Sequence, residues 1–177
     1  MATEEMIDDD DLNFDYGRNP SVVRRGAYFL IALVTVLLPV YLYVGVLDMQ
    51  LDEAQITVLI GSMMGSLLLS LAYHNIYFSK RVHVVADSSV PTKSSFKKNV
   101  AAYNAAVDAY ESKCTVTALC WSLFYNNLLY LSIVVVFGIY VLASKVPKEA
   151  NFVLSTVGAS GFAFYNSRKA MQAIGEL

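Results

Sequence analysis

The sequence predicts an all-α membrane protein with four transmembrane helices and a cytosolic helical hairpin between the second and the third. Three observations lead to this fold class. First, 56% of the 177 residues are hydrophobic and the mean hydropathy is +0.47, whereas soluble domains contain roughly 45–50% apolar residues. Second, four long runs without a charged residue follow one another along the chain. Third, a polar and net basic segment, residues 79–113, separates the second run from the third.

Residues 1–25 precede the first apolar run and are strongly acidic. They contain seven acidic and three basic side chains, with little apolar content to bury. Such a composition is typical of a solvated tail without a core of its own. We therefore expect an acidic cytosolic tail here.

The first predicted transmembrane hairpin covers residues 26–78. Residues 26–47 and 54–79 are free of charge, and about 20 apolar residues are enough to cross a hydrocarbon core of ~30 Å as a helix. The link at 48–53 is short, so the two spans must be antiparallel neighbours. Pro39 lies inside the first span, where we expect it to kink the helix.

The second predicted hairpin covers residues 114–167. Residues 114–144 are uncharged, and as a helix they would measure ~46 Å, which exceeds the bilayer core. Residues 150–167 form the fourth predicted span, which is shorter and contains several polar side chains. The link at 145–149 again allows an antiparallel hairpin, and residues 168–177 would form a cytosolic C-terminal tail.

Residues 79–113, here called the arm, carry six basic and three acidic side chains. Apolar residues recur along the arm at steps of three and four, which is the spacing of one helical face; they are Phe96, Val100, Tyr103, Val107, Tyr110 and Cys114. This pattern predicts a helix that runs into the third span, while residues 79–86 continue the second. The two limbs would form a helical hairpin that extends up to ~30 Å beyond the membrane.

The distribution of basic residues predicts the orientation. With four spans, both termini and the arm share one side of the membrane with eleven Lys and Arg residues, against Lys145 and Lys148 on the other. Because basic flanks favour the cytosolic side, we expect both termini and the arm in the cytosol. Aromatic residues near the span ends are expected to form interfacial belts; they are Tyr28, Phe29, Tyr41, Tyr43, Tyr77, Phe78, Trp121, Phe124, Tyr125, Phe164 and Tyr165.

Basic residues of the arm are candidates for contact with a phosphate-bearing partner such as ribosomal RNA. Lys93, Lys97 and Lys98 cluster near the predicted tip, where lipid attracts them little because the field of a membrane decays over about 8 Å in physiological salt. Lysines bind nucleic-acid phosphates electrostatically, whatever the base sequence. Three lysines on an exposed helix are also typical of an ordinary solvated face. Lys80 and Arg81 at the base are further candidates, but such residues commonly meet lipid phosphates and fix topology.

Polar residues inside the spans are expected to join helices. Tyr73, His74 and Asn75 lie near the cytosolic end of the second span, at the same depth as Asn126 and Asn127 of the third. Hydrogen bonds across the two helices would each contribute ~0.6 kcal/mol. Gly61 and Gly65 allow close approach of a neighbouring helix, either within the bundle or from another subunit.

The sequence offers little for catalysis. It has no glycine-rich phosphate loop, metal-ligand spacing or serine elbow, and its two histidines, His74 and His83, lack carboxylates in register. Cys114 and Cys120 are six residues apart on one predicted helix and cannot bond each other without breaking it. We expect no catalytic residue, metal or cofactor. A small four-span transporter or channel accessory subunit is the alternative, but it would need a wet path through His74 with further ionisable groups deeper in the bilayer, and the sequence has none.

Several segments resemble one family. They are Leu123-Phe124-Tyr125-Asn126-Asn127-Leu128-Leu129-Tyr130-Leu131, Leu71-Ala72-Tyr73-His74-Asn75-Ile76-Tyr77-Phe78, Asn151-Phe152-Val153-Leu154-Ser155, Ala159-Ser160-Gly161 and Arg18-Asn19. In order and spacing they are similar to the gamma subunit of the translocon-associated protein complex, also called signal sequence receptor gamma. The similarity extends over most of the chain beyond the acidic tail, with His74 in place of a lysine of the family.

The resemblance implies a multi-pass protein of the endoplasmic reticulum membrane with four spans and cytosolic ends. It further implies a non-catalytic subunit of a complex that lies beside the Sec61 channel and assists translocation and membrane insertion of nascent chains. In the family, the cytosolic arm contacts the large ribosomal subunit, both RNA and protein, near the tunnel exit. By analogy, Lys93, Lys97 and Lys98 would make this contact, although the arm is shorter and less basic than in animal members.

Overall fold

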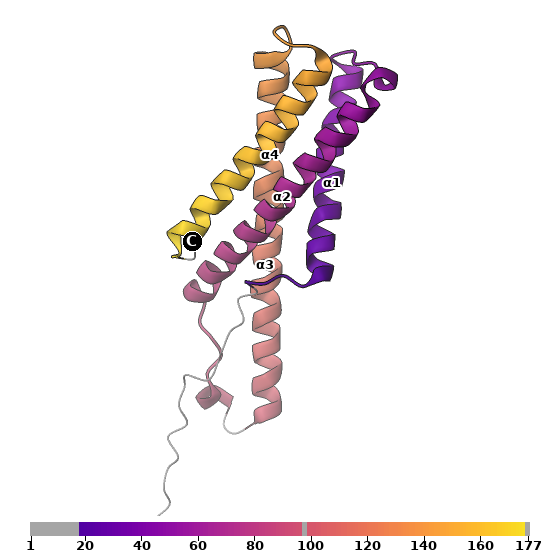
Figure 1. Cartoon of the computed structure of the whole chain (residues 1–177). Helices are drawn as coiled ribbons and strands as arrows, with labels where there is room; N and C mark the ends of the chain where they lie inside the picture. Colours follow the sequence, from indigo (N-terminus) through magenta and orange to yellow (C-terminus); the bar gives the residue numbers. More distant parts are fainter. Residues whose placement is uncertain (1–17, 97–98, 176–177) are drawn as a thin grey trace, which may run out of the picture.

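The computed structural model describes residues 18–96 and 99–175, which fold entirely into helices and their links (Figure 1). In chain order the helices are α1 (Val22–Gly45), α2 (Leu51–Asp87), the short 3-10 helix η2 (Lys93–Phe96), α3 (Val100–Val135), the π-helical segment η3 (Val136–Leu142) and α4 (Lys148–Ala173). No strand occurs in these two ranges, so the predicted all-α fold is confirmed. Most of the acidic tail, residues 1–17, lies outside them.

Local interactions set the ends of α1. The Ser21 side chain accepts a hydrogen bond from the backbone N–H of Arg24 at 3.3 Å, which caps the first turn. The helix continues through Pro39 and ends at Gly45. The chain then reverses at Asp48, whose φ of 57° is in the left-handed region, and the N–H of Met49 donates to the carbonyl of Tyr43 at 2.9 Å. This tight turn makes α1 and α2 antiparallel neighbours, as Figure 1 shows.

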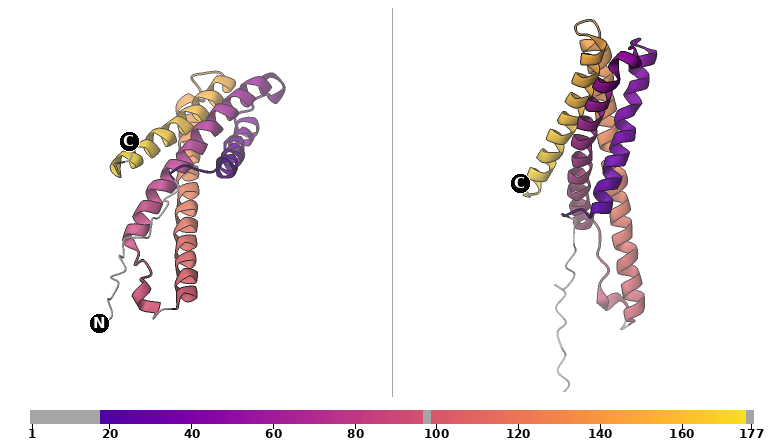
Figure 2. Two further views of the ribbon diagram at one scale, coloured as in Figure 1. Left: turned by 60° about the horizontal axis from the view of Figure 1, so that its bottom comes forward. Right: turned by 45° about the vertical axis from the view of Figure 1, so that its right-hand side comes forward.

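Helix α2 is the centre of the bundle, because it packs against each of the other three long helices. Its most extensive contact is with α4, and α1 and α3 flank it (Figure 2). With 37 residues it measures ~55 Å, and the continuous helix of α3 and η3, with 43 residues, measures ~65 Å. Both are much longer than a membrane core of ~30 Å.

Among the described residues, three helices are long and apolar enough to cross a membrane: α1, α2, and α3 together with η3. Helix α4 has 26 residues but a lower apolar content. Its polar side chains are buried against the other helices; they are Asn151, Ser155, Thr156, Ser160 and Ser167. Its outward side chains include Leu154, Phe162 and Tyr165. The fourth span remains a prediction. The low apolar content of α4 comes partly from these buried polar residues and partly from exposed ones at its ends, such as Lys148, Arg168 and Lys169.

The bundle is apolar on the outside. Large hydrophobic side chains are exposed along the long helices, among them Leu30, Val34, Leu38, Ile56, Leu59, Leu67, Leu71, Phe124, Leu128, Phe137 and Tyr140. The interior is rich in alanine, glycine and serine, with aromatic rings and a few branched side chains, such as Val36, Leu69 and Val134, between them. Large apolar side chains outside and small or polar ones inside are typical of helices that are solvated by lipid.

The two glycines of α2 lie at contacts inside the bundle. A Cβ atom on Gly61 would lie 3.3 Å from Phe152 and from Val153 of α4, and one on Gly65 would lie 3.2 Å from the Ser160 hydroxyl. The Gly65 Cβ would also be 3.3 Å from Val36 of α1. The structure therefore favours the internal contact of the two alternatives that the sequence left open.

Not all aromatic residues near the span ends lie at the surface. Tyr28, Tyr43, Tyr77 and Phe78 are at most 3% exposed, so the prediction of interfacial belts is wrong for them. They fill the space between helices that glycine, alanine and serine leave open. Tyr41, Trp121, Phe124 and Tyr165 are exposed, as the belts require.

The arm consists of two limbs of unequal length. Helix α2 continues past the predicted span to Asp87, and α3 begins at Val100, so both limbs extend from the long helices (Figure 1). The Tyr110 hydroxyl donates to the carbonyl of Val85 at 3.4 Å and links the limbs. Phe96 lies in η2 rather than in α3, but its ring still packs on Tyr103 at a centroid distance of 5.9 Å.

We predict that Gly65→Leu destabilises the bundle by about 1–3 kcal/mol, because the new side chain must displace Val36 and Ser160. Unfolding of the purified protein in detergent, followed by circular dichroism, measures the loss. Gly158→Leu is the matched control, since a Cβ at Gly158 meets nothing within 4 Å. Equal stability of the two variants would contradict the packing described here.

Candidate functional site

The tip of the arm is described only in part. Lys93 is exposed as the first residue of η2. Lys97 and Lys98 lie outside the described residues. Of the three predicted tip lysines, the structure therefore places one, on the surface of the turn between the limbs.

The two basic residues at the base of the arm have different surroundings, because consecutive residues of a helix point about 100° apart. The Lys80 ammonium lies 5.1 Å from the centroid of the Trp121 ring of α3, a distance at which a cation is attracted to the ring face. Arg81 is only 8% exposed and faces the bundle. Only Lys80 therefore lies where it can meet a phosphate at the surface.

The predicted polar contacts inside the bundle are built from three helices. The Tyr73 hydroxyl of α2 donates to the side-chain oxygen of Asn127 of α3. Thr35 of α1 joins the pair, with its hydroxyl 3.4 Å from the Asn127 oxygen and from the Tyr73 hydroxyl. The sequence grouped Tyr73 and Asn127 with His74, Asn75 and Asn126 at one depth, without naming this pair, and gave no reason to add Thr35.

The remaining predicted members bond elsewhere. Asn75 donates to the Ser167 hydroxyl of α4 at 3.0 Å, and the His74 ring nitrogen lies 2.9 Å from the carbonyl of Arg18, ahead of α1. Asn126 donates to the Ser122 carbonyl of its own helix at 2.9 Å. The second direct link between α2 and α3 comes from the Ser122 hydroxyl, which donates to the Tyr73 carbonyl at 2.6 Å.

A second polar cluster lies near the links that join α1 to α2 and η3 to α4. The Tyr43 hydroxyl is 2.8 Å from the side-chain oxygen of Asn151 and 2.6 Å from the Ser155 hydroxyl. Asn151 in turn donates to the carbonyl of Gly138 at 2.8 Å. Gly138 lies in the π-helical segment, and a Cβ there would collide with the Tyr43 hydroxyl.

Sequence analysis missed this cluster because its members are far apart in the chain. Tyr43 was expected at the membrane interface, and Asn151 is the second uncharged residue of the predicted fourth span. One signal was present. Gly138 is the only glycine between Cys114 and Ser144, and it stands among bulky apolar residues.

The described residues give the transporter alternative no support. His74 hydrogen-bonds to the main chain of Arg18, close to the start of α1, and its ring lies 6.4 Å from the Tyr28 ring. No group of three or more His, Cys, Asp or Glu side chains comes together in the ranges that the structure describes. Cys114 and Cys120 are both free.

A family model for the gamma subunit of the translocon-associated protein complex matches residues 8–167, which include α1, α2, α3, η3 and most of α4. The chain belongs to the translocon-associated protein gamma family. This match confirms the resemblance noted in the sequence. The family is named for an accessory subunit of the translocon, not for a catalytic activity.

One relative in this family is the translocon-associated protein subunit gamma of Dictyostelium discoideum. It is 29% identical over 159 residues, a span that covers 87% of this chain and 92% of the relative. The two proteins are therefore alike over nearly their whole length. The arm and both polar clusters lie inside the stretch that the translocon-associated protein gamma model matches.

The second cluster yields a test with two variants. We predict that Gly138→Ala destabilises the fold, because the added methyl group occupies the place of the Tyr43 hydroxyl. Tyr43→Phe alone removes hydrogen bonds that contribute about 0.6–1.7 kcal/mol in membrane bundles. In the Tyr43→Phe background, Gly138→Ala lowers the free energy of unfolding much less than it does in the wild type, because the oxygen that the new methyl group would meet is absent. Denaturant titration of all four proteins measures this coupling, and strict additivity would contradict the contact.

Proposed function

We propose that this chain is a non-catalytic subunit of a translocon-associated complex in the endoplasmic reticulum membrane. Its bundle binds the other subunits and the protein-conducting channel, and its arm tethers the complex to the translating ribosome. One observation carries this proposal: α3 and η3 form a single helix of 43 residues that begins at the tip of the arm. The part of the arm from Val100 onward therefore belongs to the same helix as the proposed third span.

The length of this helix supports an arm that extends outside the bilayer. At 1.5 Å per residue it measures ~65 Å, and the membrane core accounts for ~30 Å. Helix α2 measures ~55 Å, so both limbs of the arm extend from transmembrane segments. The bond from Tyr110 to Val85 holds the limbs together outside the membrane.

The proposed topology has four spans with both termini and the arm in the cytosol. Helix α4 supports a fourth span because its outward side chains Leu154, Phe162 and Tyr165 are apolar or interfacial. Its polar residues Asn151, Ser155, Thr156, Ser160 and Ser167 are buried. An average over its sequence counts both faces equally, but lipid meets only one. The excess of Lys and Arg around the arm and termini favours this orientation.

The proposed ribosome contact lies at the arm tip. Lys93 is exposed in η2, and Lys97 and Lys98 follow within five residues in the chain. Ribosomal RNA presents phosphates in a dense array, and lysines bind such an array through charge and the release of counterions. The contact would therefore weaken with salt and tolerate changes in RNA sequence.

The topology is tested by cysteine labelling in intact microsomes. On a Cys120→Ser background, we expect a membrane-impermeant maleimide to label Ser94→Cys and Gln172→Cys, but not Ser144→Cys. All three positions are exposed, so access decides the result. Permeabilised microsomes, in which all three react, are the control. Protection of Gln172→Cys would show that α4 does not cross, and protection of Ser94→Cys would place the arm in the lumen.

The ribosome contact is tested by co-sedimentation of detergent-solubilised protein with ribosomes. We expect the triple variant Lys93→Glu, Lys97→Glu, Lys98→Glu to lose most binding. The magnitude of the slope of log affinity against log salt concentration should decrease by about two. Lys93→Glu and Lys145→Glu form a matched pair of single charge reversals, one in the arm and one in the link between η3 and α4, and only the first should weaken binding. Unchanged sedimentation of the triple variant would remove the arm from the mechanism.

A further inference from the structure

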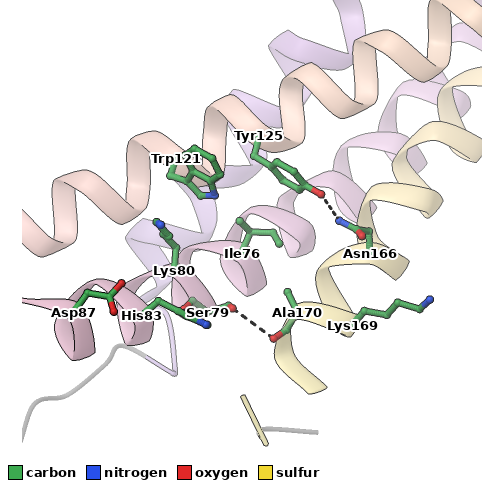
Figure 3. Close-up of a pocket in the computed structure, with 10 residues that line it drawn as sticks. All are labelled: Ile76, Ser79, Lys80, His83, Asp87, Trp121, Tyr125, Asn166, Lys169 and Ala170. Carbon is green, nitrogen blue, oxygen red and sulfur yellow. Dashed lines mark hydrogen bonds between the residues drawn. The ribbon is translucent and has the colours of Figure 1, made fainter. Parts of the chain in front are cut away.

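A groove of about 490 Å³ opens between α2, α3 and α4 at the base of the arm (Figure 3). Its walls carry a mixture of basic, acidic, aromatic and apolar side chains; they are Ile76, Ser79, Lys80, His83, Asp87, Trp121, Tyr125, Asn166, Lys169 and Ala170. We propose that this groove binds the headgroup of an anionic phospholipid. The inference rests on the proposed topology, which places the groove at the cytosolic interface of the membrane.

The side chains that α2 contributes to the groove change from apolar to charged along the helix, which matches the change from acyl chain to headgroup along a lipid. Ile76, Lys80, His83 and Asp87 recur at steps of four, three and four, so they form one stripe that runs outward along the helix. The stripe begins with an apolar residue inside the predicted span and ends with an acid beyond it. A lipid aligned with α2 would place its acyl chain root beside Ile76 and its phosphate beside Lys80.

Aromatic and polar side chains of α3 and α4 complete the site. The rings of Trp121 and Tyr125 stack with centroids 6.3 Å apart, and the Tyr125 hydroxyl accepts a hydrogen bond from Asn166 at 2.7 Å. Tryptophan and tyrosine favour the depth of the headgroups, where the ring meets acyl chains and the polar edge meets water. Together they form a wall along which the glycerol region of a lipid can lie.

Two ammonium groups lie at the rims of the groove. Lys80 rests over the Trp121 ring, and Lys169 rests over the Tyr165 ring at 4.9 Å. In the part of the chain that the structure describes, neither is paired with a carboxylate, so each can turn toward a phosphate without breaking an ion pair. Basic pockets between transmembrane helices on the cytosolic side are suited to anionic headgroups.

Asp87, next to His83 at the outer end of the groove, indicates which anionic headgroups fit best. A carboxylate there repels a second phosphate but accepts hydrogen bonds from hydroxyl or ammonium groups. The groove therefore fits a phosphodiester with a donor-rich headgroup, such as inositol, better than a polyphosphorylated one. A free phosphate would leave the apolar and aromatic inner end without a partner.

Trp121 is the only tryptophan of the chain, so its fluorescence reports on the groove. The full-length protein in detergent is titrated with phosphatidylinositol or with phosphatidylcholine of the same chains. We expect a saturable change in emission with phosphatidylinositol alone. Lys80→Gln and Lys169→Gln should each raise the apparent Kd about fivefold, whereas Lys113→Gln, an exposed lysine of α3 outside the groove, should leave it unchanged. Equal binding of the two lipids, or an unchanged Kd in both groove variants, would overturn the proposal.

Two further measurements separate the alternatives. Native mass spectrometry counts the lipids retained by each variant, which guards against a change in Trp121 emission caused by the loss of the Lys80 ammonium itself. Inorganic phosphate and soluble inositol phosphate are then added as competitors, and we expect less than a twofold loss of bound lipid. Full displacement by either would show a site for a soluble anion instead. None of these assays involves ribosomes. A negative result would therefore count against lipid binding and would not bear on the tethering function.

Discussion

Close contact between α2 and α4 is the interaction on which the bundle depends. Lipid exerts no hydrophobic pressure that drives helices together, so they associate through van der Waals packing and hydrogen bonds at short range. Gly61 and Gly65 let α4 approach within a distance that even one added Cβ atom would fill. Serines continue the same surface, since Ser66 and Ser160 are fully buried. Around these close contacts, aromatic side chains such as Tyr43, Tyr77 and Phe152 fill the remaining interior space, and many aliphatic side chains lie on the outer surface.

Two polar clusters fix the other helices to this pair at different depths. Thr35, Tyr73 and Asn127 join α1, α2 and α3 near the base of the arm. Tyr43 and Asn151 join α1 and α4 to η3 at the opposite end. Each hydrogen bond is modest, but together the clusters determine how the helices are rotated about their axes. The direction in which the arm leaves the bundle follows from that rotation.

The sequence was informative about where helices lie and less so about which way they face. Uncharged runs located the long helices. The stripe from Phe96 to Cys114 predicted a helix that begins in the arm, although α3 starts one step of the stripe later, at Val100. Inside the spans, nearly every position is apolar, so the periodicity that orients a helix in a soluble protein is absent. For this reason Tyr41 and Tyr43 looked equivalent, although the first is 84% exposed and the second is buried.

The candidate site was predictable to a similar extent. Equal depth grouped Tyr73 with Asn127, which the structure brings together, but it also grouped His74 and Asn75, whose side chains leave the helix in other directions. Thr35 and the π-helical turn at Gly138 depend on how three helices meet, and no local pattern encodes that. The groove beside Lys80 was missed because its walls come from three segments that are about 40 residues apart in the chain.

The unbroken helix from Val100 to Leu142 has a mechanical consequence. If a force tilts the outer end of this rigid helix about its contact with α2, the inner end moves in the opposite direction. The inner end carries Gly138, where an added Cβ atom would collide with the Tyr43 hydroxyl of α1, so the two helices are closely packed there. A load applied at the tip is therefore felt on the far side of the bundle, at the junction of α1 and α4.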